Sequence, residues 1–257
     1  MKTANKSMAI EYEVFKKAPI KEALIDINIE RSDRLSINSI TQLYSKLKDR
    51  FPITEKRIRR SSQFELNPSR QLEVLDHREE LKGYRFISDD NKKAVQYRLD
   101  GFTFNLLEPY SKWDHFKAEA KELWDLYTEI IPENTIIQKI GLRYINRFEV
   151  PFTKNLKEYF KTLPEIATEI PYIYSNFLMR IGFYDEKTNT KAILTEMIDE
   201  QEDTPDIIPI IFDIDAFYEC QIDYKHIEIW DILEDLRVFK NEIFHKSITE
   251  KTKELIR

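Results

Sequence analysis

Two aspartates on a strand-like run are the residues of this sequence best suited to metal-assisted chemistry. In the run IIPIIFDIDAFYEC, Asp213 and Asp215 point to one face, because side chains alternate along a strand. Paired carboxylates on a strand can hold Mg²⁺ for phosphodiester chemistry, and Glu196 on the preceding strand is a candidate third ligand. The alternatives are structural: the two aspartates face solvent at a sheet edge, or they form ion pairs with arginines of another strand.

The arginines of that second interpretation lie on the longest strand-like run, residues 134–151, which reads NTIIQKIGLRYINRFEVP. Arg143 and Arg147 are four residues apart and therefore share a face, beside Gly141, whose missing side chain permits a close approach of backbone or ligand. The face opposite the arginines is expected to be core and carries Ile136, Gln138, Ile140, Leu142, Tyr144, Asn146, Phe148 and Val150.

Two interpretations of these arginines remain open. They form either a site for an anion or a partner protein, or a seam of structural ion pairs inside the sheet. The candidate site consists of Arg143, Tyr144, Asn146, Arg147 and Glu22. The carboxylates considered as partners in a seam are Glu22, Asp26, Asp213 and Asp215.

A basic segment, residues 46–60, contains seven Lys or Arg residues in fifteen and only two acidic ones. Its strand-like half offers Lys56, Arg57, Arg59 and Arg60 as contacts. Together with the aromatic residues Tyr84 and Phe86 of a later strand, they can form a face for nucleic acid. The structural alternative is a solvated helix end followed by a charge-protected edge strand.

Other chemistry-bearing motifs are missing from the sequence. The four histidines show no metal-ligand spacing, and the four glycines are too far apart for a phosphate-binding loop. A single cysteine, Cys220, excludes an internal disulfide and any Cys-rich metal site. We therefore expect no cofactor and lean towards a protein without enzymatic activity.

The composition is that of a globular protein of the cytoplasm. The 257 residues are 42% hydrophobic and 33% charged, with signs interspersed and a formal net charge of −6. This acidic balance argues against a protein that coats nucleic acid by charge alone. No apolar run has the length of a signal peptide or a membrane span, so no membrane association is expected.

The elements that position these residues follow from periodicity and from stop signals. A first strand follows Pro19, and Pro132 closes a long helix that begins with Ser111 as cap and Asp114 three residues later. The remaining expected elements are a helix from Asn38 or Ser39 to Arg50, a meander over 56–107 with a hairpin at Asp100-Gly101, the strand 134–151, a short helix over 155–163, strands over 170–184, 191–198 and 207–218, and a helix over 227–256 that is continuous or broken near Ser247.

This order predicts an α+β fold, mainly antiparallel sheet covered on one face by two long helices, with two similar halves as a possibility. No Gly-, Ser- or Pro-rich linker separates the halves 10–150 and 151–257. We therefore predict a single integrated domain, 1–257.

Three segments resemble a sporadically distributed prokaryotic family of uncharacterised proteins. They are Ala18-Pro19-Ile20-Lys21-Glu22-Ala23, Ile140-Gly141-Leu142-Arg143-Tyr144-Ile145-Asn146-Arg147, and Asn241-Glu242-Ile243-Phe244. The family shows a Pro-Pro-Ile-x-Glu-Ala opening and a Gly-Leu-Arg-Tyr-Ile-Asn segment, and this chain departs from it at Ala18. The resemblance implies no reaction, cofactor or catalytic residue. The patchy occurrence of the family is similar to that of phage-defence or toxin–antitoxin components.

Three functional hypotheses follow. The first is a non-enzymatic component that binds a protein partner or self-associates, within an accessory module of the defence or toxin–antitoxin kind. The second is a nucleic-acid-binding protein that uses segment 46–60. The third is a metal-dependent phosphodiesterase built on Asp213, Asp215 and Glu196.

Overall fold

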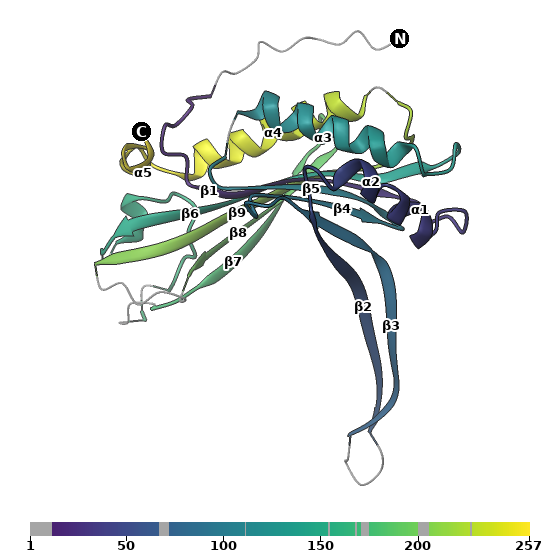
Figure 1. The fold of residues 1–257 in the computed structure, drawn as a ribbon. Coiled ribbons are helices and arrows are strands. Elements are labelled where there is room, and N and C mark those ends of the chain that lie inside the picture. The colour runs from purple at the N-terminus through teal and green to yellow at the C-terminus, as the bar shows by residue number, and fades with distance from the viewer. Residues whose placement is uncertain are drawn as a thin grey trace. The chain divides into compact units, whose positions relative to one another are not determined.

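The computed structural model of the chain describes residues 12–66, 72–110, 112–153, 155–167, 169–170, 175–199, 206–226 and 228–257; for 61–66 and 72–78 it describes the backbone alone. Its strands pair in one antiparallel sheet of order β2-β3-β4-β5-β1-β6-β9-β8-β7 (Figure 1). The strands are β1 (Ile20–Ile29), β2 (Ile53–Leu66), β3 (Leu72–Ile87), β4 (Lys93–Arg98), β5 (Gly101–Leu107), β6 (Ile136–Pro151), β7 (Leu178–Asp185), β8 (Thr190–Ile198) and β9 (Ile207–Asp223).

Two long helices pack against this sheet, which confirms the predicted α+β class. The helical elements are α1 (Ile37–Gln42), α2 (Tyr44–Leu47), α3 (Trp113–Thr128), η1 (Leu156–Glu158), α4 (Ile229–Ser247) and α5 (Glu250–Ile256). Each long helix presents an apolar stripe at helical spacing, and burial of that stripe is the main contribution to the stability of an amphipathic helix.

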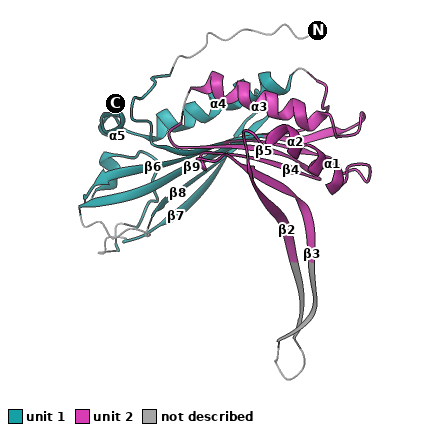
Figure 2. Cartoon of the chain, in the orientation of Figure 1, with its two compact units in different colours: residues 1–23, 141–218, 227–257 teal, residues 24–140, 219–226 magenta. Residues whose placement is uncertain are grey.

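The chain divides into two compact units, coloured separately in Figure 2. Unit 1 contains residues 1–23, 141–218 and 227–257, and unit 2 contains 24–140 and 219–226. The boundaries fall inside β1, β6 and β9, so these three strands contribute residues to both units. The single integrated domain and the two similar halves stay predictions.

In unit 2, aromatic side chains of β4, β5 and α3 form the core. Tyr97 stacks on Phe102 and Tyr127, with ring centroids 5.9 and 5.4 Å apart, and Phe102 meets Trp124 edge-on at 5.7 Å. The Tyr97 hydroxyl donates to the carbonyl oxygen of Leu123 at 2.8 Å, so this buried polar group is satisfied. The packing fixes α3 on the sheet.

In unit 1, four phenylalanines have the equivalent role. Phe148 lies 5.4 Å from Phe160 and 6.1 Å from Phe212, and it stacks on Phe244 of α4 at 6.0 Å. Phe148, Phe160 and Phe212 are completely buried or nearly so. This cluster defines the face of unit 1 that α4 covers.

Several predicted elements have different bounds in the structure. The expected 38–50 helix is two short helices, α1 and α2, and the N-cap is Ser36, whose side chain accepts from the Ser39 amide. Ser36, Asn38 and Ser39 are all residue types that favour the N-cap position, so the sequence alone did not determine where the helix begins. The meander is confirmed, but the two strands expected on either side of residue 80 are one long strand, β3.

The predicted 155–163 helix is wrong beyond the single turn of η1. Phe160 leaves the helix because it forms a β-bridge with Ile248, supported by a 2.7 Å hydrogen bond from the Lys161 amide to the Ser247 carbonyl. The predicted break near Ser247 is confirmed, since α4 ends there and Thr249 caps α5. The predicted Ser111 cap lies outside the described residues, and the N-cap of α3 is Lys112, without a side-chain capping bond.

Candidate functional site

Arg143 of β6 forms a two-pronged ion pair with Asp213 of β9. Its Nε donates to Asp213 Oδ1 at 2.8 Å and its Nη2 to Oδ2 at 2.6 Å. This is the fork geometry in which arginine binds carboxylates most strongly. The pair lies on the face opposite α4, where Asp215 and Glu22 also attract the guanidinium; the hydrogen bonds to Asp213 are the main cause that raises the pKa of Arg143.

Two carboxylates that were not predicted as partners, Asp199 and Glu149, bind Arg147. Its Nε donates to Asp199 at 3.1 Å and its Nη1 to Glu149 at 3.1 Å, and its side chain is largely buried. Asp199 belongs to the acidic stretch before β9. Residues 200–205 of that stretch lie outside the described residues.

Asp26, predicted as a further partner of these arginines, belongs to a different network, inside unit 2. It accepts from Arg98 Nη2 at 3.1 Å and from the Thr103 hydroxyl at 2.6 Å. Arg98 also donates to Asn28 at 2.8 Å, so its guanidinium is held on several sides. The seam interpretation is therefore supported for Arg143 and Asp213, while Asp26 is part of another ion pair.

The candidate set Arg143, Tyr144, Asn146, Arg147 and Glu22 is divided between the two faces of the sheet. Tyr144 and Asn146 are 3% exposed on the α4 side, and the Asn146 amide donates to the Phe212 carbonyl at 2.9 Å. Strand alternation requires this, because adjacent residues of a strand point in opposite directions. A ligand on the arginine face does not contact Tyr144 or Asn146.

The alternation of β6 also differs at its start from the pattern that the sequence predicts. Ile137 is fully buried and Gln138 is exposed, the reverse of the prediction, whereas from Ile140 onward the predicted core face is correct. Two fully buried residues three apart require an irregularity between them, of the kind that an extra residue produces.

Glu196 does not join Asp213 and Asp215, so the predicted metal-ligand set is not assembled. Glu196 pairs across the sheet with Phe212 and points to the α4 side, whereas Asp213 pairs with Thr195 and points to the other side. Within the described residues, no group of three His, Cys, Asp or Glu side chains is arranged to hold a metal ion.

Glu196 is instead a buried carboxyl group without a hydrogen-bond partner among the described residues. Its side chain is 0% exposed, and neither carboxylate oxygen has a partner. Because burial disfavours the charged form, it raises the pKa of Glu196 to about 8. Glu196 therefore keeps its proton at neutral pH.

Lys240 of α4 is a second buried ionisable group of unit 1, which the sequence reasoning missed. Its Nζ lies 3.9 Å from the ring centroid of Tyr144, and burial lowers its pKa to about 7. The signal was present, because Lys240 follows Leu236 by four residues and precedes Ile243 by three, which places it on the apolar stripe.

The basic segment 46–60 divides into a paired half and a projecting half. In the helical half, Lys46 pairs with Glu129, and Arg50 donates to Glu119 at 2.7 Å. The positive charges of Lys46 and Arg50 are therefore neutralised by carboxylates of α3 and its C-cap. The strand half belongs to β2, where every residue from 52 to 60 is exposed, whichever face its side chain points to.

β2 and β3 leave the rest of the sheet as a two-stranded ribbon (Figure 1). β4 accompanies β3 only as far as the pair Gly83–Arg98, and at this point the β2–β3 register shifts, leaving Lys82 without a partner residue on β2. Such a bulge bends a strand and increases its twist. Gly83 is required at the bend, because a Cβ there would lie 2.1 Å from the Tyr97 carbonyl oxygen.

We use the name ribbon for the described side chains of the β2–β3 pair, residues 53–60 and 79–87, of which β3 residues 83–87 also pair with β4. They include six basic and three acidic residues, a net charge of +3 in a chain whose net charge is −6. Arg60 pairs with Glu79 at 2.7 Å and Arg85 with Glu55 at 3.4 Å. Lys56, Arg57 and Arg59 make no ion pair within the part of the chain that the structure describes.

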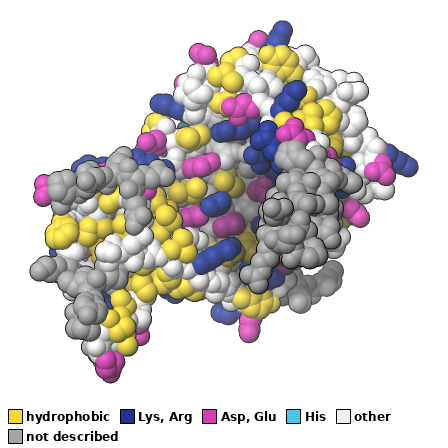
Figure 3. Space-filling view, turned by 90° about the horizontal axis from the view of Figure 1, so that it is seen from below, with side chains coloured by type: hydrophobic (Ala, Val, Ile, Leu, Met, Phe, Trp, Pro, Cys, Tyr) yellow, Lys and Arg dark blue, Asp and Glu magenta, His cyan; other side chains and the backbone are white. Residues whose placement is uncertain are grey.

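In the view of the molecule from below, basic and acidic side chains lie next to one another among hydrophobic ones (Figure 3).

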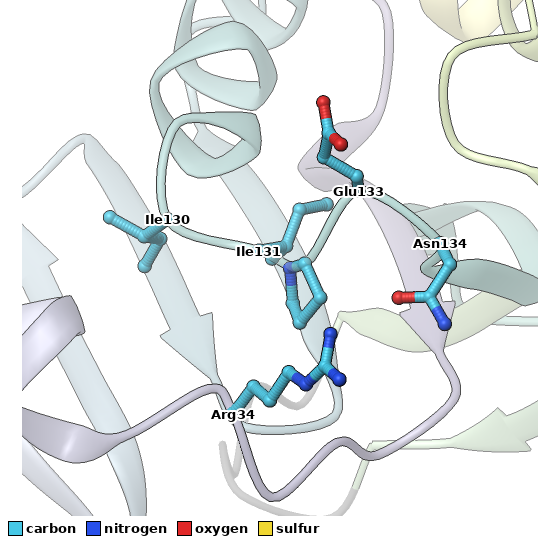
Figure 4. Close-up of a pocket in the computed structure, with 6 residues that line it drawn as sticks. Arg34, Ile130, Ile131, Glu133 and Asn134 are labelled. Carbon is cyan, nitrogen blue, oxygen red and sulfur yellow. The ribbon is translucent and has the colours of Figure 1, made fainter.

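A depression in unit 2 offers no catalytic group. It is lined by Ile130, Ile131, Pro132, Glu133, Asn134 and Arg34. Arg34 extends beneath the loop, while the Glu133 carboxylate points away (Figure 4) and pairs with Lys225 at 3.5 Å. Arg34 and Asn134 are exposed, so the depression has no buried polar pair to activate a substrate.

Cys220 and His245 are structural. Burial raises the pKa of the Cys220 thiol, which donates to the Ile137 carbonyl at 3.5 Å. His245 stacks on Tyr12 and Phe15, with centroids 4.9 and 5.4 Å apart, and burial lowers its pKa to about 4. Neither residue is adapted to nucleophilic or acid–base chemistry at neutral pH.

Comparison with known proteins found no family model and no curated protein that matches this chain. The resemblance to the sporadically distributed family thus stays a prediction. Among the described residues, no helix combines the length and the apolar character that crossing a membrane requires.

Proposed function

We propose that this protein is a non-enzymatic interaction component whose ribbon binds a protein partner. The observation that carries this proposal is the exposure of every β2 side chain from residue 53 to 60, on both faces of the strand. An isolated pair of strands is marginally stable in water and gains little from its own packing. A partner that covers the ribbon supplies the missing contacts.

The chemistry of the ribbon favours a partner with acidic and apolar groups. Ile58 is 42% exposed and lies opposite Leu81, so an apolar pair is available on one face. Arg57 and Arg59 share the other face, and Arg57 lies opposite Gly83, which has no side chain to shield it. A surface of this kind combines an apolar anchor with exposed arginines, as interaction hot spots do.

The test is affinity purification from cells that express the protein naturally. The charge-reversing variant R57E/R59E should lose at least 90% of a partner that the wild type retains. The matched control K92E/K121E changes the net charge equally, at exposed positions outside the ribbon, and should retain the partner. Equal recovery with R57E/R59E and with the wild type would contradict the proposal.

Nucleic acid is the second candidate, favoured by three basic residues, Lys56, Arg57 and Arg59, that have no ion pair with any described residue. A two-stranded ribbon fits the major groove of DNA, and contacts to phosphate make binding weaken steeply with salt. Fluorescence anisotropy with labelled duplex DNA and single-stranded RNA, at about 50 and 200 mM salt, tests this. Unchanged anisotropy at both salt concentrations would remove the candidate.

The resemblance to the sporadically distributed family supports a narrower proposal, that the partner belongs to the same accessory module. Co-expression of the neighbouring genes with wild type or with R57E/R59E, followed by phage plating, tests it. Protection that depends on Arg57 and Arg59 is the expected result, and equal plating efficiencies would contradict it.

A further inference from the structure

The outer edge of β7, in unit 1, is the second edge of the sheet that the described strands form. In the sheet order β7 is the last strand, and among the described residues no strand pairs with its outer side. Its eight residues read LMRIGFYD and pair with β8 without a register shift. The backbone amides and carbonyls along this side are therefore a template for another strand.

β7 lacks the features by which proteins protect such edges. It has no proline and no bulge, and Arg180 is the one charged residue before Asp185 at its end. On the face opposite α4, Leu178 is 70% and Tyr184 56% exposed, and a Cβ at Gly182 would meet nothing within 4 Å. A straight apolar edge of this kind pairs readily with an extended chain.

We propose that β7 is a self-association edge, at which a second copy of this chain adds its own β7 antiparallel, about a two-fold axis at Ile181. A two-fold axis perpendicular to the sheet keeps residues of one face on that face in both copies. With Ile181 opposite Ile181, Leu178 lies opposite Tyr184 of the other copy and Met179 opposite Phe183. The strand is thus complementary to itself in one register.

The charged residue also fits this register. Arg180 lies opposite Gly182 of the other copy, so no like charges are directly opposed, and its side chain has free space above the glycine. The two most exposed apolar side chains of the strand cover each other. This match between Leu178 and Tyr184 is the argument for a second copy as occupant, in preference to a foreign peptide.

The interface is small, since one strand edge carries it, and weak dimerisation in the micromolar range is expected. Sedimentation velocity of the full chain from about 1 to 500 µM should show a shift from monomer to dimer. The variant L178K/Y184K should stay monomeric across this range, because it places lysines at the paired positions. The control V238K/F152K makes the same type of change at other exposed apolar positions and should dimerise like the wild type.

The register is tested by cross-linking in a Cys220→Ser background. With oxidised glutathione as oxidant, Ile181→Cys should give an intermolecular disulfide, because the two cysteines meet at the axis. Met179→Cys should not, because Phe183 of the other copy lies opposite it. A wild type that stays monomeric at 500 µM, an L178K/Y184K variant that dimerises, or preferential cross-linking of Met179→Cys would each overturn the proposal.

This inference is independent of the ribbon. R57E/R59E should dimerise like the wild type, and L178K/Y184K should still bind the ribbon's partner. Failure of one proposal therefore leaves the other standing.

Discussion

The two strands at the ends of the sheet order, β2 and β7, both have backbone amides and carbonyls on an outer side, but they differ in how far their residues discourage pairing with another strand. β2 carries Lys56, Arg57, Arg59 and Arg60 in succession around Ile58, and two register shifts interrupt its pairing with β3. β7 has a single internal charge and a regular register. Charge and bulges discourage pairing with another strand. β2 is thus suited to recognition through side chains, and β7 to recognition through the backbone.

The difference also shows how a strand edge indicates a type of partner. A strand such as β2, exposed on both faces from residue 53 to 60, offers side chains in two directions but a protected edge, so its partner must be complementary in charge and shape. A regular apolar edge offers hydrogen-bonding groups in a fixed array and accepts a strand. Three stability measurements test whether the two edge regions differ in this way.

The largest effect is expected from the glycines of the two edge regions. Gly83→Ala places a methyl group 2.1 Å from the Tyr97 carbonyl oxygen and 2.7 Å from Arg98 Cα, so the backbone must move. We expect a loss of more than about 3 kcal/mol in the free energy of unfolding, measured by urea titration. Gly182→Ala in β7 is the control, with a change within about 0.5 kcal/mol. Equal effects at the two positions would refute the difference in packing.

A smaller effect is expected from Glu196, which lies opposite Met179 of β7. Burial raises its pKa to about 8 from the ordinary 4.5, so between these pH values the folded state keeps a proton that the unfolded state has lost. Stability therefore falls as pH rises from 4.5 to 8. Glu196→Gln removes this dependence and should stabilise the protein by about 2 kcal/mol at pH 8, and little at pH 4.5.

The control for this pH dependence is Glu186→Gln, at an exposed position of the β7–β8 turn. Thermal unfolding of both variants between pH 4.5 and 8 measures the difference. A Glu196→Gln variant whose stability follows that of the wild type at every pH would show that the Glu196 carboxyl has a partner.

The smallest effect compares two arginines. Arg143→Ala leaves Asp213, whose side chain is 12% exposed, without its guanidinium, and about 1 kcal/mol should be lost because the exposed arginine is partly screened by solvent. Arg59→Ala removes an arginine without an ion pair within the described residues and should change stability by less than about 0.5 kcal/mol. Chemical denaturation at one pH suffices. A larger loss of stability for Arg59→Ala than for Arg143→Ala would show that Arg59 contributes to the stability of the fold.

Much of the fold could be predicted because it depends on local patterns. Alternation over 140–150 correctly gave the core face of β6, and the helix predicted over 227–256 with a break near Ser247 is found as α4 and α5. Predictions from the local pattern were wrong where a residue distant in the sequence made the deciding contact. Phe160 left its predicted helix for a bridge to Ile248, and Ile137 took the core position assigned to Gln138. Such choices depend on contacts between segments that the local sequence does not contain.

For the candidate sites, the sequence determined which face each strand residue takes, because the period of a strand is fixed by its backbone. The sequence thereby indicated Arg143 and Asp213 as possible ion-pair partners. Only the tertiary structure decided which strands are neighbours, and thus that Glu196 faces α4 while Asp213 faces away from it. The charges of segment 46–60 already suggested an edge strand at β2, whereas only strand order reveals that β7 is an edge, because its own residues carry no such protective charges.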